Sequence, residues 1–378
     1  MKFIVAPDSF KESLSAVQAS NAIAKGIRKV FPDPDIRLIP IADGGEGTCE
    51  VITHALGGEI HHTQVAGPLG EQTRAKFGYV FDNQTAIVEV AEAIGIHLVA
   101  EDARNIWSAN SFGVGQLLQK VLDLGATRVI LGLGGSVTND GGVGMLNALG
   151  VQALDFSGSP LPATPRGLEQ CVSVDFSALD PRWDDVHIII ASDVVSPATG
   201  PNGATHIFGQ QKGARTTDLP ALDNVISKWV KALENASSRE INDYPGAGAA
   251  GAIATGLLAF FNVSITPGAD LILDLVNYSD HCDKDCIVFT GEGKIDNQTA
   301  FGKGPARVAQ LSKELGAQVF AFGGLIDKTA DDLIPTYFDA VIPITRNIGD
   351  LQNALATAEE NLSEASIMLC HILNANNR

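Results

Sequence analysis

Four loops rich in glycine and acidic residues carry the side chains of this sequence that could do chemistry. They are residues 6–13 (APDSFKES), 42–48 (ADGGEGT), 132–142 (GLGGSVTNDGG) and 290–299 (TGEGKIDNQT). Each follows a short apolar run and precedes a helical pattern, which is where open α/β sheets bind ligands. Glycine lets backbone N–H groups crowd around an anion, and neighbouring acids suggest a metal that offsets phosphate charge. Together the loops predict an enzyme that handles phosphate.

The loop at 132–144 is the strongest candidate for contact with a nucleotide. It holds six glycines in thirteen residues, and backbone amides at the start of a helix favour anions. The predicted nucleotide-binding residues are Gly134, Gly135, Ser136, Thr138 and Asn139. A glycine-rich turn that only lets a strand and a helix pack is the alternative. The loop lacks the Gly-Lys-Ser/Thr ending of a Walker A loop and a clean G-x-G-x-x-G pattern.

Acids and bases accompany the glycines in the first two loops. Asp8 and Lys11 come just after the first predicted strand and are predicted to act in catalysis, although a surface ion pair would explain the same spacing. Asp43, Gly44 and Gly45 are predicted to bind the substrate. A helix N-cap would explain one carboxylate there, but it would not explain the whole Asp-Gly-Gly-Glu cluster.

Further carboxylates follow apolar runs later in the chain. Asp193 ends the most apolar strand of the middle region and is predicted to take the proton of a substrate hydroxyl, with a turn cap as the alternative. Lys294 and Asp296 are predicted to bind the substrate. Asp140 and Glu292 are the predicted metal ligands. A solvated loop is the alternative for the fourth loop.

The composition indicates a folded, acidic protein. The chain has 378 residues, is 45% hydrophobic and carries a net charge of −18. Such acidity argues against nucleic acid and anionic membranes as partners, because both are bound through basic surfaces. An anionic substrate must therefore be held by local cations. The candidates are Lys11, Lys294, Lys303 and Arg307.

Cysteine usage and hydropathy predict the compartment. The five cysteines are odd in number and the chain is long, so we expect reduced thiols rather than a disulfide framework. The N-terminus runs straight into a strand, and no apolar stretch approaches the ~20 residues of a membrane span. We expect the protein to be cytoplasmic and to be a monomer or a homodimer. We expect its partners to be small molecules and neither nucleic acid nor a membrane.

Short strands alternate with helices at both ends of the chain. Strands are predicted at 3–6, 36–41, 286–290, 318–322 and 340–344, and a long closing helix at 351–373. The β-α-β-α order indicates a parallel sheet. The predicted fold is α/β: a doubly wound parallel-sheet (Rossmann-like) domain with an inserted second α/β domain and the active site in the cleft between them.

The predicted domain boundaries follow from this pattern. Residues 1–65 plus 283–378 form the Rossmann-like domain, and residues 66–282 form the inserted α/β domain. Two consecutive domains that divide near residue 180 are the alternative.

Taken in order, the motifs resemble the class I glycerate kinase family of bacteria. The matching stretches are residues 6–16 (APDSFKESLSA), 40–48 (PIADGGEGT), 67–71 (GPLGE), 132–150 (GLGGSVTNDGGVGMLNALG), 191–194 (ASDV), 209–214 (GQQKGA), 245–251 (PGAGAAG) and 290–303 (TGEGKIDNQTAFGK). The resemblance spans nearly the whole chain. It implies phosphorylation of D-glycerate with ATP and Mg²⁺, with 2-phosphoglycerate as the product of the bacterial type.

Several positions depart from the family pattern, including Ser196-Pro197-Ala198, where Asn-Pro-Leu is usual. Val114 and Gln116 stand where Thr and Glu are usual, and Ala252 stands where Gly is usual. These changes leave two alternatives open, namely a binding protein that has lost turnover and a kinase for another small 2-hydroxy acid. A hydrolase is less favoured, because the sequence has no G-x-S-x-G elbow and no matched Cys-His signature.

Overall fold

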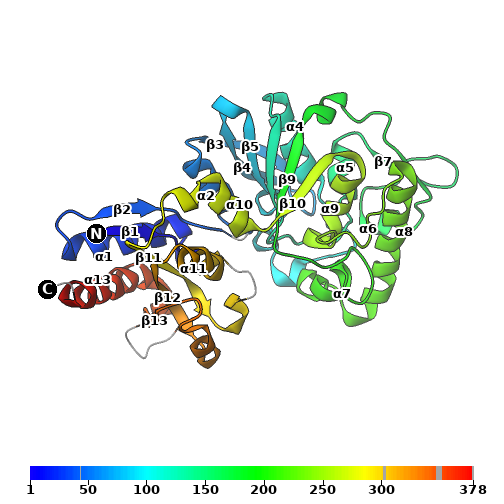
Figure 1. Ribbon diagram of the computed structural model, residues 1–378. Coiled ribbons are helices and arrows are strands. Elements are labelled where there is room, and N and C mark those ends of the chain that lie inside the picture. Colours follow the sequence, from blue (N-terminus) through cyan, green and yellow to red (C-terminus); the bar gives the residue numbers. More distant parts are fainter. Residues whose placement is uncertain (43, 301–303, 346–350, 377–378) are drawn as a thin grey trace. The chain divides into compact units, whose positions relative to one another are not determined.

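The computed structural model describes residues 1–42, 44–300, 304–345 and 351–376, which fold into two compact units (Figure 1). Unit 1 comprises Met1–Asp43 and Pro267–Arg378, and unit 2 comprises Gly44–Thr266. Each unit is built around its own β-sheet with helices packed on it. The chain therefore leaves the first unit, forms the second, and returns.

Unit 1 contains a five-stranded, fully parallel sheet in the order β13-β12-β11-β1-β2. Its strands are β1 (Lys2–Val5), β2 (Asp35–Leu38), β11 (Cys286–Ile295), β12 (Gln318–Ile326) and β13 (Ala340–Pro343). Its helices are α1 (Ala16–Val30), α10 (Gly268–Leu275), α11 (Gly304–Glu314), α12 (Leu351–Ala356) and α13 (Ala358–Asn376).

Aromatic residues form the core on one face of this sheet. The ring of Phe289 lies 5.7 Å from that of Phe3 and 5.5 Å from that of Phe322, and helices α1 and α13 cover the cluster. Ile4 and Val288 alternate with these residues along the strands and are also buried. Helix α11 packs against β11 and β12. Burial on both faces is the doubly wound arrangement that the sequence predicted.

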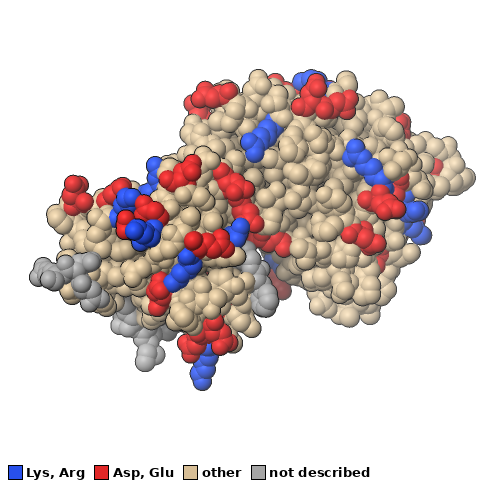
Figure 2. Space-filling model, viewed as in Figure 1, with Lys and Arg blue, Asp and Glu red and all other residues tan. Residues whose placement is uncertain are grey.

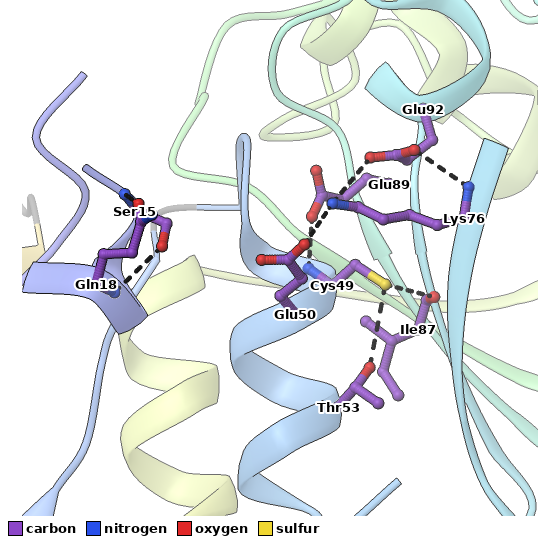
Figure 3. Close-up of polar contacts among 9 residues, drawn as sticks. All are labelled: Ser15, Gln18, Cys49, Glu50, Thr53, Lys76, Ile87, Glu89 and Glu92. Carbon is purple, nitrogen blue, oxygen red and sulfur yellow. Dashed lines mark hydrogen bonds and ion pairs between the residues drawn. The ribbon is translucent and has the colours of Figure 1, made fainter. Parts of the chain in front are cut away.

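Helix α1 begins at a capping box. The Ser15 hydroxyl accepts a hydrogen bond from the Gln18 backbone N–H (3.2 Å), and the Gln18 side chain accepts one from the Ser15 N–H (2.9 Å), as Figure 3 shows. The two side chains satisfy backbone donors that the first helical turn leaves without intrahelical partners. The start of this helix is therefore encoded locally.

Unit 2 contains a six-stranded sheet in the order β10-β9-β6-β5-β4-β3. Its strands are β3 (Glu59–Ala66), β4 (Gln72–Val80), β5 (Thr85–Glu89), β6 (Arg128–Gly132), β9 (His187–Ala191) and β10 (Asn262–Thr266), and β7 (Gln152–Leu154) pairs separately with β8 (Ser173–Asp175). Its helices are α2 (Thr48–Ala55), α3 (Ala91–Ile94), α4 (Phe112–Asp123), α5 (Val143–Ala148), α6 (Pro165–Leu168), α7 (Ala204–Phe208), α8 (Leu219–Ser237) and α9 (Ala249–Phe260).

The central strands of unit 2 are parallel and buried. Strands β5, β6, β9 and β10 run in one direction, whereas β3 and β4 form an antiparallel edge. The apolar runs of β6 and β9 pack against helices α4, α5 and α8 in one continuous core. Near-continuous apolar sequence is typical of parallel strands that are covered on both faces.

Three features differ from the sequence-based expectation. Strand β11 does not end at residue 290 but continues to Ile295, because it pairs with β12 and places Glu292 opposite Gly323 and Lys294 opposite Leu325. The predicted closing helix is interrupted between α12 and α13. The antiparallel β3–β4 hairpin was not predicted at all.

The compact units also divide at residues different from the expected domain boundaries at 65 and 283. Helix α2 packs against β4 and β5, which joins residues 44–65 to unit 2. Helix α10 packs against α11, which joins residues 267–282 to unit 1. That the two units fold as independent domains stays a prediction.

The surface agrees with the acidic composition. Figure 2 shows Lys and Arg interspersed with Asp and Glu on the face in view, without a continuous basic surface among the residues described there. Within the described ranges, no helix combines the length and apolar character needed to cross a bilayer.

Candidate functional site

Three neighbouring strands of unit 2 end together at the candidate nucleotide loop. Glu89, Gly132 and Ala191 occupy the same register position at the carboxyl ends of β5, β6 and β9. The predicted substrate residue Gly44 lies beside them, since its carbonyl accepts a hydrogen bond from Gly134 N–H (3.0 Å). Gly44 has φ +86°, and a Cβ there would lie 2.3 Å from the Ala191 carbonyl oxygen. Only glycine fits this contact.

The glycine-rich loop itself is buried and closely supported. Ser136, Thr138 and Asn139 are each no more than 5% exposed. The backbone of Gly251, from the PGAGAAG motif, packs so closely that a Cβ there would lie 2.2 Å from the Thr138 carbonyl oxygen. The Gly251 carbonyl accepts a hydrogen bond from Gly141 N–H (3.0 Å). Gly251 of the PGAGAAG motif therefore allows close backbone packing against the loop.

Asp140 anchors the same loop to helix α4. Its carboxylate accepts four hydrogen bonds, from the Ser111 N–H (2.8 Å) and hydroxyl (2.7 Å) and from the N–H groups of Gly142 (3.1 Å) and Gly144 (3.1 Å). Burial raises the pKa of Asp140, and these four donors oppose that shift. Because protein donors already occupy the carboxylate, this geometry fits a structural anchor better than a metal ligand.

Asp193 stands at the carboxyl end of β9, as the sequence predicted. It is exposed, in contrast to the buried Asp140. The preceding Ser192 hydroxyl accepts the Val194 N–H (3.2 Å), so a serine rather than Asp193 provides this hydrogen bond of the turn. The structure thus places an exposed carboxylate just beyond the end of a buried parallel strand.

Sequence reasoning missed the buried acid Glu89. Its carboxylate accepts the Cys49 N–H (2.5 Å) and points to the start of helix α2, while Lys76 lies 2.7 Å from Glu50 and 3.6 Å from Glu92 (Figure 3). Burial raises the pKa of Glu89 to about 7, with hydrogen bonds from Cys49 and Gly47 and the charge of Lys76 opposing the shift. A single acid at a strand end was the available sequence signal, but it lay outside the glycine-rich loops.

The raised pKa of Glu89 predicts that the stability of the protein depends on pH. The folded state holds a proton on Glu89 between about pH 4.3 and 7 that the unfolded chain releases, so the free energy of unfolding falls by about 3–4 kcal/mol as pH rises through this window. Glu89→Gln should remove this fall, because glutamine does not titrate. Urea unfolding followed by tryptophan fluorescence at pH 5 and pH 7.5 measures it.

The matched control for this prediction is Glu50→Gln. Glu50 forms an ion pair with Lys76, whose charge also acts on Glu89, but 44% of the Glu50 side chain is exposed. This variant should keep the wild-type pH dependence. An unchanged fall in Glu89→Gln would contradict the assignment to Glu89.

The structure of unit 2 accounts for three of the residues that differ from the usual family pattern. The Gln116 side-chain oxygen accepts the Ala66 N–H (2.7 Å), a contact that a glutamate oxygen would also make, and Val114 is fully buried in the core. Ala252 has φ +63° and, with Ala250 and Gly251, forms a left-handed turn within α9. Glycine adopts this conformation with less strain than alanine, which is consistent with its usual presence there.

The predicted residues of unit 1 gather at the ends of two neighbouring strands. The Asp8 N–H donates to the Gly291 carbonyl (2.8 Å), which joins the loop after β1 to β11. A Cβ on Gly293 would lie 3.2 Å from the Lys11 backbone nitrogen, so Lys11 is brought to the same edge. Lys11 itself is exposed.

Strand β11 contributes two charged side chains to this edge, Glu292 and Lys294, and Asp296 follows directly after the strand. Lys294 forms an ion pair with Asp296 (2.8 Å), and this contact raises the pKa of Lys294. Glu292 accepts a hydrogen bond from the Thr299 hydroxyl (2.7 Å). The strand pairing, rather than a flexible loop, thus sets the spacing of Glu292 and Lys294.

The structure describes some of the remaining predicted site residues but not all of them. Asp43 and Lys303 lie outside the described residues. Arg307 is paired with Asp270 and is therefore already engaged within unit 1. The predicted metal ligands Asp140 and Glu292 lie in different units. No group of three or more His, Cys, Asp or Glu side chains suited to a metal occurs in the part of the chain that the structure describes.

Comparison with known proteins agrees with the fold and the motifs. A protein of Haemophilus influenzae named glycerate kinase is 42% identical over 99% of both chains. Glycerate 2-kinase of Escherichia coli K12 is 40% identical over 97% of this chain and 96% of its own. A crystal structure of a Salmonella typhimurium LT2 protein described as glycerate kinase 2 superposes with a TM-score of 0.88 at 37% identity, covering 100% of this chain and 99% of the other.

The family comparison covers nearly every residue. The model of the glycerate kinase family matches residues 3–374, which contain all four glycine- and acid-rich loops. The glycine-rich loop of unit 2 and the strand-end charges of unit 1 both fall within this match. On this evidence the chain belongs to the glycerate kinase family.

Proposed function

We propose that the protein transfers the γ-phosphoryl group of ATP to D-glycerate, at the 2-hydroxyl, giving 2-phospho-D-glycerate and ADP. The observation that carries this proposal is the family match over residues 3–374. The 2-hydroxyl is favoured because the Escherichia coli relative, which covers 97% of this chain, is named glycerate 2-kinase. Phosphoryl transfer depends mainly on positioning and electrostatic stabilisation, which closely packed loops can supply.

In unit 2 the proposed role of the glycine-rich loop is to hold the nucleotide phosphates. Its candidate residues are Gly134, Gly135, Ser136, Thr138 and Asn139. The Thr138 hydroxyl and the Asn139 side-chain oxygen are buried without a hydrogen-bond partner among the described residues. Buried polar atoms are usually satisfied, so these two atoms support the presence of a ligand or of water bound with it. Asp193 is the proposed base that takes the proton of the attacking hydroxyl.

The proposed role of Gly44 and Gly45 is to approach the substrate through their backbone. In unit 1, Lys11 and Lys294 are proposed to supply positive charge to an anionic substrate, and Asp296 is proposed to orient Lys294. Asp8 is proposed to position reacting groups beside Lys11. Such local cations are needed because the protein as a whole carries a charge of −18.

Mg²⁺ enters this proposal as part of the nucleotide substrate. Asp140 does not fit a metal ligand, since four protein donors occupy its carboxylate. Mg²⁺ in phosphoryl-transfer enzymes is bound largely by substrate phosphates and water, with only one or two carboxylates. Glu292 remains a candidate for one such carboxylate. The metal would neutralise the charge of the phosphates when bound.

A coupled ADP-release assay tests the proposed function. We expect saturable ADP release with D-glycerate, ATP and Mg²⁺, and weaker release with L-glycerate, glycolate and tartronate. Phosphorus NMR of the product should place the phosphate on the 2-hydroxyl. Release with another acid alone would identify a different 2-hydroxy-acid kinase. Thermal stabilisation by glycerate with no ADP produced by folded protein would instead support a binding protein.

We further propose that the reaction takes place in the cytoplasm. All five cysteines are unpaired thiols, and such usage is typical of reducing compartments. Cell fractionation of the source organism would test this location, and recovery with secreted proteins would contradict it.

A further inference from the structure

A buried lysine that the sequence-based assignments did not include lies against the glycine-rich loop. Lys212 ends the short 3-10 helix Gln210–Lys212 and is 3% exposed. Its ammonium donates to the Ser136 hydroxyl (3.0 Å) and the Thr138 carbonyl (2.7 Å). Two of its three donors therefore hold the segment that is proposed to bind phosphate.

The acceptors of Lys212 are neutral oxygens, so its charge is not compensated by direct contact with them. Asp140 is the acid whose charge acts on Lys212, but the Asp140 carboxylate is already bound by four other donors. Burial lowers the pKa of Lys212 to about 7, and the charge of Asp140 opposes this shift. Burying an ammonium among neutral acceptors costs free energy. A bound anion would offset that cost.

The same segment contains polar atoms that the described residues leave unsatisfied. These are the Thr138 hydroxyl and the Asn139 side-chain oxygen, whose residues are fully buried. The Asn139 amide nitrogen is held by the Thr205 hydroxyl (2.9 Å), so this side chain is fixed in place. A buried positive charge against the glycine-rich loop and unsatisfied polar atoms within that loop indicate a site prepared for an anionic ligand.

We propose that Lys212 is a positioning residue for the nucleotide. It holds Ser136 and Thr138 in the conformation that presents the loop to the phosphate groups, and it places a positive charge behind them. This inference rests on the proposed function and adds to it a residue that acts on the phosphates through the loop. Preorganised positive charge of this kind favours bound phosphate without later rearrangement.

Ligands of different charge separate this role from a purely structural one. Lys212→Met keeps the aliphatic side chain and removes the charge, so ADP should bind roughly ten- to a hundredfold more weakly while adenosine binding changes less than about twofold. Lys212→Arg restores a positive charge and should recover part of the ADP affinity. Lys228→Met is the control, because Lys228 is an exposed lysine of helix α8 and should bind both ligands as wild type does. Isothermal titration calorimetry measures all four proteins.

Equal losses of ADP and adenosine affinity in Lys212→Met would overturn the inference, since they would indicate general damage to the loop. If that variant does not fold, Lys212→Gln keeps a donor without the charge and should show the same selective loss of ADP affinity. If Lys212→Met turned over D-glycerate and bound ADP as the wild type does, the role of Lys212 would be refuted, whereas the proposed function would stand. A folded wild type that neither binds ADP nor turns over would refute the proposed function as well.

Discussion

Replacing Asp140 with alanine is expected to lower the free energy of unfolding of unit 2 by about 3–5 kcal/mol. The change leaves four buried donors, on Ser111, Gly142 and Gly144, without their acceptor. It also removes the acid whose charge acts on Lys212. The three tryptophans, Trp107, Trp183 and Trp229, all lie in unit 2, so urea unfolding followed by tryptophan fluorescence measures this loss directly.

The matched control is Asp155→Ala. Asp155 also accepts hydrogen bonds from nearby donors, the N–H and hydroxyl of Ser157 and the N–H of Ser159, but on an exposed turn. Water can replace its oxygens there, so we expect a loss of no more than about 1 kcal/mol. A wild-type urea midpoint in Asp140→Ala would show that Asp140 does not anchor the loop.

Replacing Asp193 with asparagine is expected to reduce kcat for D-glycerate by roughly a hundred- to ten-thousandfold. Asparagine is nearly isosteric but cannot accept the hydroxyl proton. Because Asp193 is exposed, the stability of the protein should change little. Steady-state ADP release gives kcat and KM, and calorimetry with ADP checks that nucleotide binding is retained.

The control for this variant is Asp185→Asn. Asp185 is an exposed acid that closes the 3-10 helix Pro181–Asp185 before β9, whereas Asp193 follows β9. It should retain wild-type kcat. If Asp193→Asn also kept kcat within about twofold of wild type, Asp193 would not be the base, and Asp8 and Asp296 would be the next residues to substitute.

The sequence by itself determined the local elements that glycine and capping residues encode. The Ser15 capping box specifies the start of α1, since its hydrogen bonds join residues three apart. The positions of the strands of unit 1 along the chain and the glycine-rich loops were also predicted, because periodic apolar runs and clustered glycines are local patterns. Family membership followed from the order of these motifs and was confirmed over residues 3–374.

The extent of β11 could not be predicted in the same way. Residues 291–295 contain two glycines and alternate in polarity irregularly, which favours a loop. Their strand conformation depends on hydrogen bonds to β12, so only the tertiary structure showed that Glu292 and Lys294 are held by a sheet. The roles proposed for these charges are still predictions.

Tertiary structure alone revealed Glu89 and Lys212. Glu89 caps a helix start 40 residues away in sequence, and Lys212 holds a serine 76 residues away. Burial and the partners that compensate it are properties of the folded chain, because they depend on which distant segments exclude water from the side chain. Sequence spacing located the loops that are proposed to contact the ligands, whereas long-range packing decided which charged side chains support those loops from within.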